Sequence, residues 1–468
     1  MEHPHISASD KSPNRKTAGF TREVIDRARS IRLDALPASS VVRAKHCLLD
    51  WFGVTIGGGS HPATRILRET LLEESARPDA TVVGSRQRAS PFVAALINGT
   101  AGHVLDFDDG FPLVRTHPTV PVAPALFALA EVEQSVGEDV LAAFVAGVDV
   151  EARIGLALGA SHYSAGWHAT GTLGTFGAAA ACCHLLNLGV DKWENALGLA
   201  ATQAAGLCAM FGTMSKPLHA GKAAQNGLLA AQLARRGFTS HPAAIEADLG
   251  FARTQAPQFE PQDAFAFPMG EHAVDNVLFK RYAACAGTHS AIDAARQLRE
   301  EHGVSADDIK RLTVELPELL FGVCNIQCPQ TALEAKFSVR FTTAVALLGG
   351  DLNEQGFTDE LTHDPRVAAL CTRIDVEPRA GGSPDDISTT PLTAYLRDGR
   401  QVHACVVAGR PTPDADLGEQ RMVLERKCRG LTTSVIGSEN TESLIEKVSR
   451  LEELTSISDV IALLRAPA

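Results

Sequence analysis

The sequence predicts a mainly α-helical protein with a large all-helical domain, a smaller α+β lid domain, and C-terminal helices that return to the helical domain. Three observations support this fold class. Apolar residues recur at three- and four-residue intervals from Thr21 to about Gly237. After Phe267, short alternating segments typical of strands appear among the helices. The last segment is again helical, and its apolar positions need a surface to cover.

Glycine and proline punctuate the periodic segments and so define the expected elements. In the first domain we expect helices at 41–56, 63–74, 91–105, 121–136, 139–158, 174–188, 191–207 and 221–236. In the lid we expect helices at 289–301 and 337–348, and strands at 309–316, 374–378, 393–397 and 403–407. A linker at 409–419 leads to a helical tail at 420–464. The expected division is a disordered leader at 1–17, a helical domain at 18–270, the lid at 271–410, and the linker with its C-terminal helices at 411–468.

Composition excludes several classes of protein. The chain has 468 residues, of which 45% are hydrophobic, enough for substantial cores, and runs of alanine and glycine suit helices packed backbone to backbone. A net charge of -12 argues against nucleic acid or an anionic membrane as a partner. The ten cysteines form no C-x-x-C pair, so reduced thiols and no iron–sulfur cluster are expected. The N-terminal segment lacks the apolar core of a secretory signal, and we expect a cytoplasmic protein without a membrane span.

The most informative segment is an acidic turn that follows an apolar helix. It contains Asp106, Asp108 and Asp109, and Arg115 and His117 follow shortly after. Ionised carboxylates cannot be buried without partners, so the segment indicates either a chemical site or a solvated acidic loop that caps the next helix. Both interpretations are open at this point.

Two glycine-rich segments add imidazoles and a cation. Residues 162–172 are predicted to form a loop that opens the next helix, where Thr170, Thr172 and backbone N–H groups could hold a carboxylate. Their glycine spacing is not the dinucleotide-binding fingerprint. In the segment 212–222, Lys216 precedes His219 between apolar flanks, which predicts that Lys216 is partly buried and has an anionic partner.

Two further segments lie at or beyond the expected domain boundary. Residues 280–289 begin the lid, and clefts between domains commonly bind ligands. The charges of the segment 336–341, which begins with Lys336, are expected on the surface face of a helix.

Taken together, these segments resemble the MmgE/PrpD family, which includes 2-methylcitrate dehydratase, cis-aconitate decarboxylase and iminodisuccinate epimerase. The resemblance covers residues 20–460 in order, and its motifs are Asp106-Phe107-Asp108-Asp109, His117-Pro118, Gly166-Trp167-His168, Thr170-Gly171-Thr172, Gly212-Thr213-Met214, Lys216, Leu218-His219-Ala220-Gly221, 280–289 and Ala335-Lys336-Phe337-Ser338. It implies a helical domain with an α+β lid, a homodimer and no cofactor.

The resemblance also implies which residues form the site. The implied catalytic residues are Asp106, His117, Tyr163, His168, Lys216 and Lys280. The implied substrate-binding residues are Arg115, Thr170, His219, Cys285 and His289, with no metal ligand. The chain departs from the decarboxylases at Gly110, where they have threonine, and at Cys285, where they have histidine. The segments around Arg115 and Tyr163 look closer to the epimerase branch.

These residues suggest a role for each group. Lys216, Lys280 and Arg115 would neutralise carboxylates and the charge that develops during the reaction. His117 and His168 suit proton transfer, Tyr163 would be a second acid or base, and Asp106 would orient an imidazole.

The resulting hypothesis is a cofactor-independent enzyme that abstracts a proton next to a carboxylate of a small di- or tricarboxylic acid, as a 2-methylcitrate dehydratase-like lyase. An iminodisuccinate epimerase-like isomerase is the alternative. A metal-dependent hydrolase using His103, Asp106, Asp109 and His117 is a second alternative, because imidazole and carboxylate groups bind divalent ions. A helical carboxylate-binding protein without catalytic activity also remains open.

Overall fold

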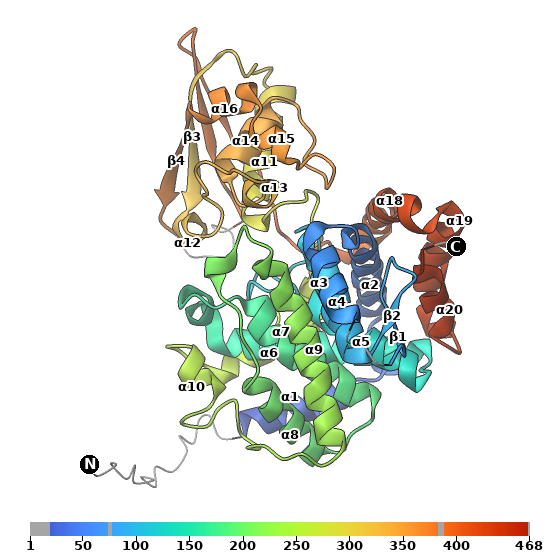
Figure 1. Ribbon diagram of the computed structural model, residues 1–468. Helices are drawn as coiled ribbons and strands as arrows, with labels where there is room; N and C mark the ends of the chain where they lie inside the picture. The colour runs from blue at the N-terminus through green and yellow to red at the C-terminus, as the bar shows by residue number, and fades with distance from the viewer. Residues whose placement is uncertain (1–18, 74–76, 382–387, 467–468) are drawn as a thin grey trace, which may run out of the picture.

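The computed structural model describes residues 19–73, 77–381 and 388–466 (Figure 1). The leader expected at residues 1–17 lies outside the described residues. Helices dominate the described chain and strands are few, which confirms the mainly α-helical fold class.

The larger part of the molecule is a stack of helices around one extended apolar core. Its helices are α1 (Phe20–Arg29), α2 (Ala38–Gly58), α3 (Pro62–Leu72), α4 (Pro91–Val104), α5 (Thr119–Glu133), α6 (Gly137–Ser164), α7 (Ala169–Leu185), α8 (Val190–Ala201), α9 (Ser215–Arg235) and α10 (Phe251–Gln255). A short hairpin of β1 (Ala80–Thr81) and β2 (Arg88–Ala89) precedes α4. At the centre, α7 packs against α5, α6 and α9, and α9 packs against α4.

Small residues allow these central helices to approach closely. A Cβ atom added to Gly99 of α4 would lie 2.8 Å from the Cα atom of Gly221 in α9. A Cβ atom added to Gly227 of α9 would lie 2.5 Å from the Cβ atom of Ala178 in α7. Any larger side chain at these positions would push the helices apart, so the expected backbone-to-backbone packing is confirmed.

The junction between α6 and α7 differs from the expected loop at 162–172. Helix α6 continues to Ser164 beyond a kink at Gly159, where φ is +58°, and α7 begins at Ala169. Thr170 and Thr172 are therefore in the first turn of α7 and not in a loop. The prediction was wrong because it ended the helix at Leu158, before the glycine whose left-handed conformation only kinks it.

The lid is a separate α+β layer at the upper left of Figure 1. Its elements are α11 (His289–Glu300), β3 (Ile309–Pro317), α12 (Glu318–Phe321), α13 (Ala332–Ala335), α14 (Val339–Leu347), α15 (Asp359–Thr362), α16 (Pro365–Cys371), β4 (Ile374–Arg379), β5 (Leu392–Leu396) and β6 (Gln401–Ala404). The sheet order is β4-β3-β5-β6, with β3 parallel to β4 and antiparallel to β5. Helices α11 and α14 pack on this sheet and enclose a second apolar core.

The C-terminal helices lie against the helical part and not against the lid sheet (Figure 1). They are α18 (Leu417–Ile436), α19 (Ser438–Ser449) and α20 (Ser458–Ile461), and both α18 and α19 pack on α2. Among the described helices, none is both long enough and apolar enough to cross a membrane. The end of α4, the start of α9, the start of the lid and helix α18 converge where the chemistry-bearing residues lie.

Candidate active site

The acidic turn after α4 is buried. The exposed fractions of Asp106, Asp108 and Asp109 are 3%, 1% and 1%. The interpretation as a solvated acidic loop is therefore wrong, because every one of these carboxyl groups has left water. Asp106 has a φ of +50°, a left-handed conformation that side-chain-bearing residues rarely adopt and that a surrounding structure must hold in place.

Two lysines neutralise Asp106. Lys216 from the start of α9 and Lys280 from the start of the lid both contact its Oδ1 atom, and the Nζ atom of Lys280 lies 3.1 Å away. Burial alone would raise the pKa of Asp106, but Lys216 and Lys280 hold that pKa well below its usual value. Burial opposes the charge of Lys280, yet Asp106 outweighs it and raises the lysine's pKa. The predicted burial and anionic partner of Lys216 are confirmed.

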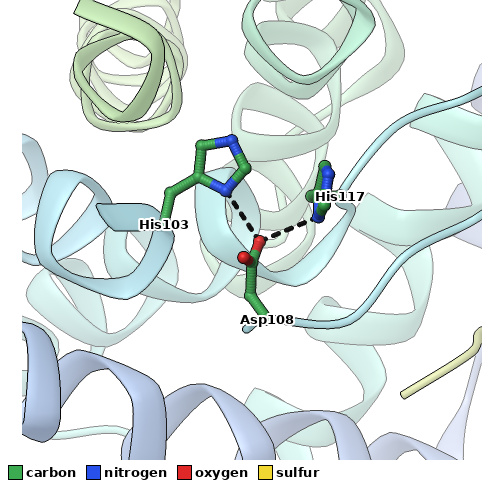
Figure 2. Close-up of side chains that lie close together, drawn as sticks. All are labelled: His103, Asp108 and His117. Atoms are coloured by element: carbon green, nitrogen blue, oxygen red, sulfur yellow. Dashed lines mark hydrogen bonds and ion pairs between the residues drawn. The ribbon is translucent and has the colours of Figure 1, made fainter. Parts of the chain in front are cut away.

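The neighbouring carboxylate of Asp108 joins two imidazoles, as Figure 2 shows. Its Oδ2 atom lies 2.8 Å from Nδ1 of His103 and 3.0 Å from Nδ1 of His117. The expectation that Asp106 orients an imidazole is therefore corrected, since Asp108 has that role and Asp106 binds lysines. Sequence reasoning placed the right residue type in the turn, but two aspartates separated by one residue can exchange roles when the backbone of the first is left-handed.

The hydrogen bonds of His117 determine its tautomer. Its Nδ1 atom contacts two acceptors, Oδ2 of Asp108 and, at 2.7 Å, the backbone oxygen of Asp109. Nδ1 therefore carries the hydrogen and Nε2 of the neutral ring has a free lone pair. Figure 2 shows that this second nitrogen points away from Asp108. The side chain of His117 is 16% exposed, so this nitrogen is the one available to a substrate.

His103 is the buried counterpart of His117. Burial lowers the pKa of His103 to about 3, so its ring is neutral. At Asp108, burial alone would raise the pKa of the carboxyl group, but the neighbouring His103 and His117 outweigh burial and lower it. Nε2 of His103 and Oδ1 of Asp108 are buried without a hydrogen-bond partner. Sequence reasoning named His103 only as a metal ligand and gave Asp108 no catalytic role, although the D-F-D-D motif contained the signal.

A second pair of imidazoles lies beside the first. Nδ1 of His168, just before α7, is 2.9 Å from Nδ1 of His219 in α9, and the His168 ring stacks on His103 with 5.7 Å between centroids. Burial lowers the pKa of His168 well below its usual value and that of His219 to about 4. The ammonium of Lys216 lies 5.1 Å from the ring centroid of Phe337, which comes from the lid. The predicted residues His117, His168, His219 and Lys216 are therefore close neighbours.

A guanidinium and a phenol form a second pair among the expected site residues. The Arg115 guanidinium lies over the Tyr163 ring, 5.2 Å from its centroid. Arg115 has a φ of +54°, and its Nη1 atom is buried without a partner. Among the described residues no carboxylate pairs with Arg115, so its charge is available for an anion. Burial raises the pKa of Tyr163 well above its usual value, so the phenol keeps its proton.

Other predicted binding residues have partners inside the protein. The Thr170 hydroxyl accepts a hydrogen bond from the backbone N–H of His117 at 3.1 Å, so it supports that histidine. Cys285 hydrogen-bonds to Cys324, which lowers the pKa of the Cys285 thiol, and Lys280 lies near it. Nε2 of His289 lies 3.2 Å from the backbone oxygen of Ala284.

Lys336 is not on a surface helix face as expected. Only 4% of it is exposed, and its Nζ atom donates to the backbone oxygens of Leu105 at 2.6 Å and Ala283 at 2.9 Å. Burial lowers its pKa to about 7. The sequence prediction failed because Lys336 precedes α14, and its neighbours in space come from distant segments that periodicity does not reveal.

The structure also changes the metal hypothesis. Of the four ligands expected, Asp106 is taken by lysines, and Asp109 shares a hydrogen bond with the Thr119 hydroxyl. Burial raises the pKa of Asp109 well above its usual value, which disfavours the ionised carboxylate that a metal ion needs as a ligand. Among the described residues, the group with suitable atoms within 4.8 Å of one another is His103, Asp108 and His117. In this arrangement the two Nδ1 hydrogens and the Asp108 oxygen satisfy one another.

Comparison with known proteins places this geometry in context. Residues 22–264 match the MmgE/PrpD N-terminal domain, and residues 282–453 match the MmgE/PrpD C-terminal domain. The chain is 29% identical to the cis-aconitate decarboxylase of Homo sapiens, over 92% of this chain and 91% of that protein. It is 28% identical to a cis-aconitate decarboxylase-like protein of Aspergillus oryzae, over 98% and 99% of the two chains. It is 25% identical to the 2-methylcitrate dehydratase of Salmonella typhimurium, over 76% and 77%.

Proposed function

The chain belongs to the MmgE/PrpD family, and we propose that it is a lyase that abstracts a proton next to a carboxylate of a small di- or tricarboxylic acid, in the manner of a 2-methylcitrate dehydratase. One observation supports this most strongly. An imidazole with a free Nε2 nitrogen, His117, is joined through Asp108 to the buried turn in which Asp106 binds Lys216 and Lys280. A base beside fixed cations is what proton removal next to a carboxylate requires.

Each group has a proposed role in that reaction. Nε2 of His117 receives the proton, and Asp108 stabilises the imidazolium that forms. Lys216 and Lys280 stabilise negative charge as it develops on the substrate carboxylate. His168 and its neighbour His219 provide a second proton-handling pair.

The Arg115 and Tyr163 pair supports a substrate with more than one carboxylate. Arg115 has no anionic partner among the described residues, so we assign it to a second carboxylate of the substrate. Tyr163 keeps its proton, so it acts as an acid toward the leaving hydroxyl group and not as a base. Cys285 and His289 line the lid side of the site in this proposal.

Decarboxylation is the second candidate reaction, because the chain matches decarboxylases over more than nine tenths of both chains. The same cations would stabilise the carbanion left when CO2 departs. Gly110 and Cys285, which replace a threonine and a histidine in the decarboxylase pattern, count against decarboxylation.

Proton NMR in D2O distinguishes these reactions in one experiment. The purified protein is incubated separately with citrate-like, aconitate-like and aminodicarboxylate compounds. Loss of the hydroxylated substrate with appearance of the signals of an alkene product supports the dehydratase, and conversion of an aconitate-like compound to a product that has lost CO2 supports the decarboxylase. Exchange of the α proton with interconversion of enantiomers identifies the epimerase instead. Saturable binding without turnover or exchange of any compound would reject an enzymatic function.

We also propose that the protein works as a homodimer in the cytoplasm. All ten cysteines are free, including the neighbouring thiols of Cys285 and Cys324, which fits a reducing compartment. Light scattering of the protein as it elutes from a size-exclusion column measures its molar mass and so its oligomeric state. Cell fractionation identifies the compartment.

A further inference from the structure

Three consecutive backbone carbonyls in the acidic turn each accept a hydrogen bond from a lysine. Lys336 donates to the oxygen of Leu105 at 2.6 Å, and Lys280 donates to the oxygen of Asp106 at 3.0 Å. Lys427 donates to the oxygen of Phe107. Carbonyls at the end of a helix lack intrahelical partners and carry partial negative charge, so ammonium groups are suitable donors.

The three lysines come from three separate segments. Lys280 lies at the start of the lid, before α11, and Lys336 lies further along the lid, between α13 and α14. Lys427 belongs to α18, the long C-terminal helix that packs on α2. Lys427 is 147 residues away in sequence from Lys280, and nothing in the proposed chemistry requires a lysine there. All three donors are buried or nearly so, and each hydrogen bond crosses between elements that are distant in the chain.

The Lys427 ammonium has several contacts that fix its position. Its Nζ atom lies 2.6 Å from Oδ1 of Asp50 in α2 and 3.8 Å from the ring centroid of Phe107. Side-chain exposure is 8% for Lys427 and 1% for Asp50. A buried ammonium with a buried carboxylate partner has little freedom, so the Phe107 carbonyl is held at a fixed point.

The backbone at Asp106 needs such support. Its φ of +50° is a costly conformation for an aspartate, and it persists only where surrounding contacts enforce it. The carbonyls on both sides of this residue, at Leu105 and Phe107, are the ones held by Lys336 and Lys427. This backbone conformation determines that Asp106 faces the lysines and Asp108 faces the imidazoles.

We propose that Lys427 is a positioning residue for the reaction: together with Lys336 on the lid side, it holds the Asp106 turn in its left-handed conformation. Lys427 acts through the Phe107 carbonyl and touches neither substrate nor reacting atoms. The active site is then complete only when α18 is docked on α2. The inference relies on the proposed function for its kinetic measurement alone.

The test removes the Lys427 bond without leaving a buried charge unpaired. The wild type is the reference, because Asp50→Asn alone would leave the Lys427 ammonium without its carboxylate, and Asp50→Asn combined with Lys427→Met is the test variant. The matched control is Lys45→Met, because the Lys45 ammonium also ties α2 to the C-terminal segment, through the Ser449 oxygen and Glu452, and does not contact the turn.

Two measurements are made on each variant of the full chain. Hydrogen exchange of a peptide spanning residues 104–110 is measured without substrate, and kcat and KM are measured with the substrate identified by NMR. Relative to the reference, we expect the test variant to exchange faster in this peptide and to lose roughly 10- to 100-fold in kcat, with KM changed less than about threefold, because a small displacement of catalytic groups costs that much. Lys427→Arg, which keeps a donor and the charge, should recover most of the kcat.

The outcomes separate this inference from the proposed function. Unchanged exchange in the turn, or an unchanged kcat, overturns the positioning role even if the protein is a dehydratase. An equal loss of kcat in Lys45→Met also overturns it, because the effect would then be general loosening of the tail. If no tested compound is converted, faster exchange confined to the turn still supports the structural part, and unchanged exchange still rejects it. If the test variant does not fold, Lys427→Gln in the same background is measured in its place and judged by the same criteria.

Discussion

Replacing Asp108 with asparagine tests whether one carboxylate oxygen controls both imidazoles. Oδ2 of Asp108 now accepts from His103 and His117. An amide has one accepting oxygen and one donating NH2 group. If the oxygen takes the place of Oδ2, the NH2 group is buried at Oδ1, an atom that has no partner in the described structure. If the NH2 group faces the rings, both imidazoles must shift their hydrogen to Nε2, and His117 loses its free nitrogen.

The magnitude follows from the two hydrogen bonds. Bonds to a charged group stabilise by about 1.5–3 kcal/mol and neutral bonds by about 0.5–1.5 kcal/mol, so each bond weakens by roughly 1–2 kcal/mol. Two bonds at 2.8 Å and 3.0 Å therefore lose about 2–4 kcal/mol together. If this loss falls on the transition state, in which His117 becomes charged, kcat of Asp108→Asn decreases by roughly 30- to 1000-fold.

Asp109→Asn is the matched control in the same turn. Asp109 is equally buried, but burial raises its pKa and therefore favours its neutral form, and the Thr119 hydroxyl donates to it. Exchange of one neutral group for another should lower kcat by less than about fivefold. Turnover is followed by NMR, and nitrogen-15 NMR of the histidines reports the tautomer. A kcat for Asp108→Asn within about threefold of the wild-type value, with unchanged tautomers, would refute the reasoning.

Four further predictions follow from the same geometry. Lys216→Ala should lower kcat by roughly 10²- to 10⁴-fold with the circular dichroism spectrum unchanged, and retained activity with a shifted melting temperature would show a structural role. Tyr163→Phe should lower the rate of alkene formation by about 10²-fold or more, because the neutral phenol is removed as an acid; an unchanged rate would place it outside the chemistry. Burial lowers the pKa of the folded His289 to about 3. Between pH 6.5 and 3 the imidazole is therefore protonated only in the unfolded chain, and the free energy of unfolding decreases as the pH decreases. In urea melts at pH 6.5 and 5, the stability advantage of the wild type over His289→Asn should shrink by about 1.6 kcal/mol, and a constant difference would contradict the assignment. Finally, dialysis against a chelator should leave activity unchanged, and a loss restored by a divalent ion would instead favour the site of His103, Asp108 and His117.

Residue type and local order predicted much of the molecule. Apolar residues at three- and four-residue intervals located α4 and most of α9, although α9 begins at Ser215, before the expected start at residue 221. Runs of small residues predicted close helix packing, which the contact of Gly99 with Gly221 illustrates. The burial of Lys216 was predictable because apolar residues flank it in the sequence, and most of those that follow it in α9 are buried and hold the lysine in the interior with them. These features depend on neighbours that are close in sequence.

Other features depend on contacts that sequence order does not contain. The buried position of Lys336 arises from carbonyls at Leu105 and Ala283, which are respectively 231 and 53 residues away. The role of Asp108 follows from the left-handed backbone of Asp106, a conformation that propensity assigns to glycine. The sequence pattern places Lys427 on the polar face of a helix and does not reveal its contacts with Asp50 and Phe107, which come from distant segments.

The structure separates charge stabilisation from proton transfer within a single turn. Three acids of the turn are buried, and their partners differ. Lysines and imidazoles lower the pKa of Asp106 and Asp108, whereas Asp109 has a hydroxyl partner and burial raises its pKa. Because Lys216 and Lys280 provide the positive charge, the histidines have no need to be cations, and burial keeps His103 neutral. His117 therefore offers a basic nitrogen near fixed ammonium groups, a combination that an imidazolium could not provide. An acidic protein can in this way bind and activate an anionic substrate, since the local cations act at short range in a site withdrawn from water.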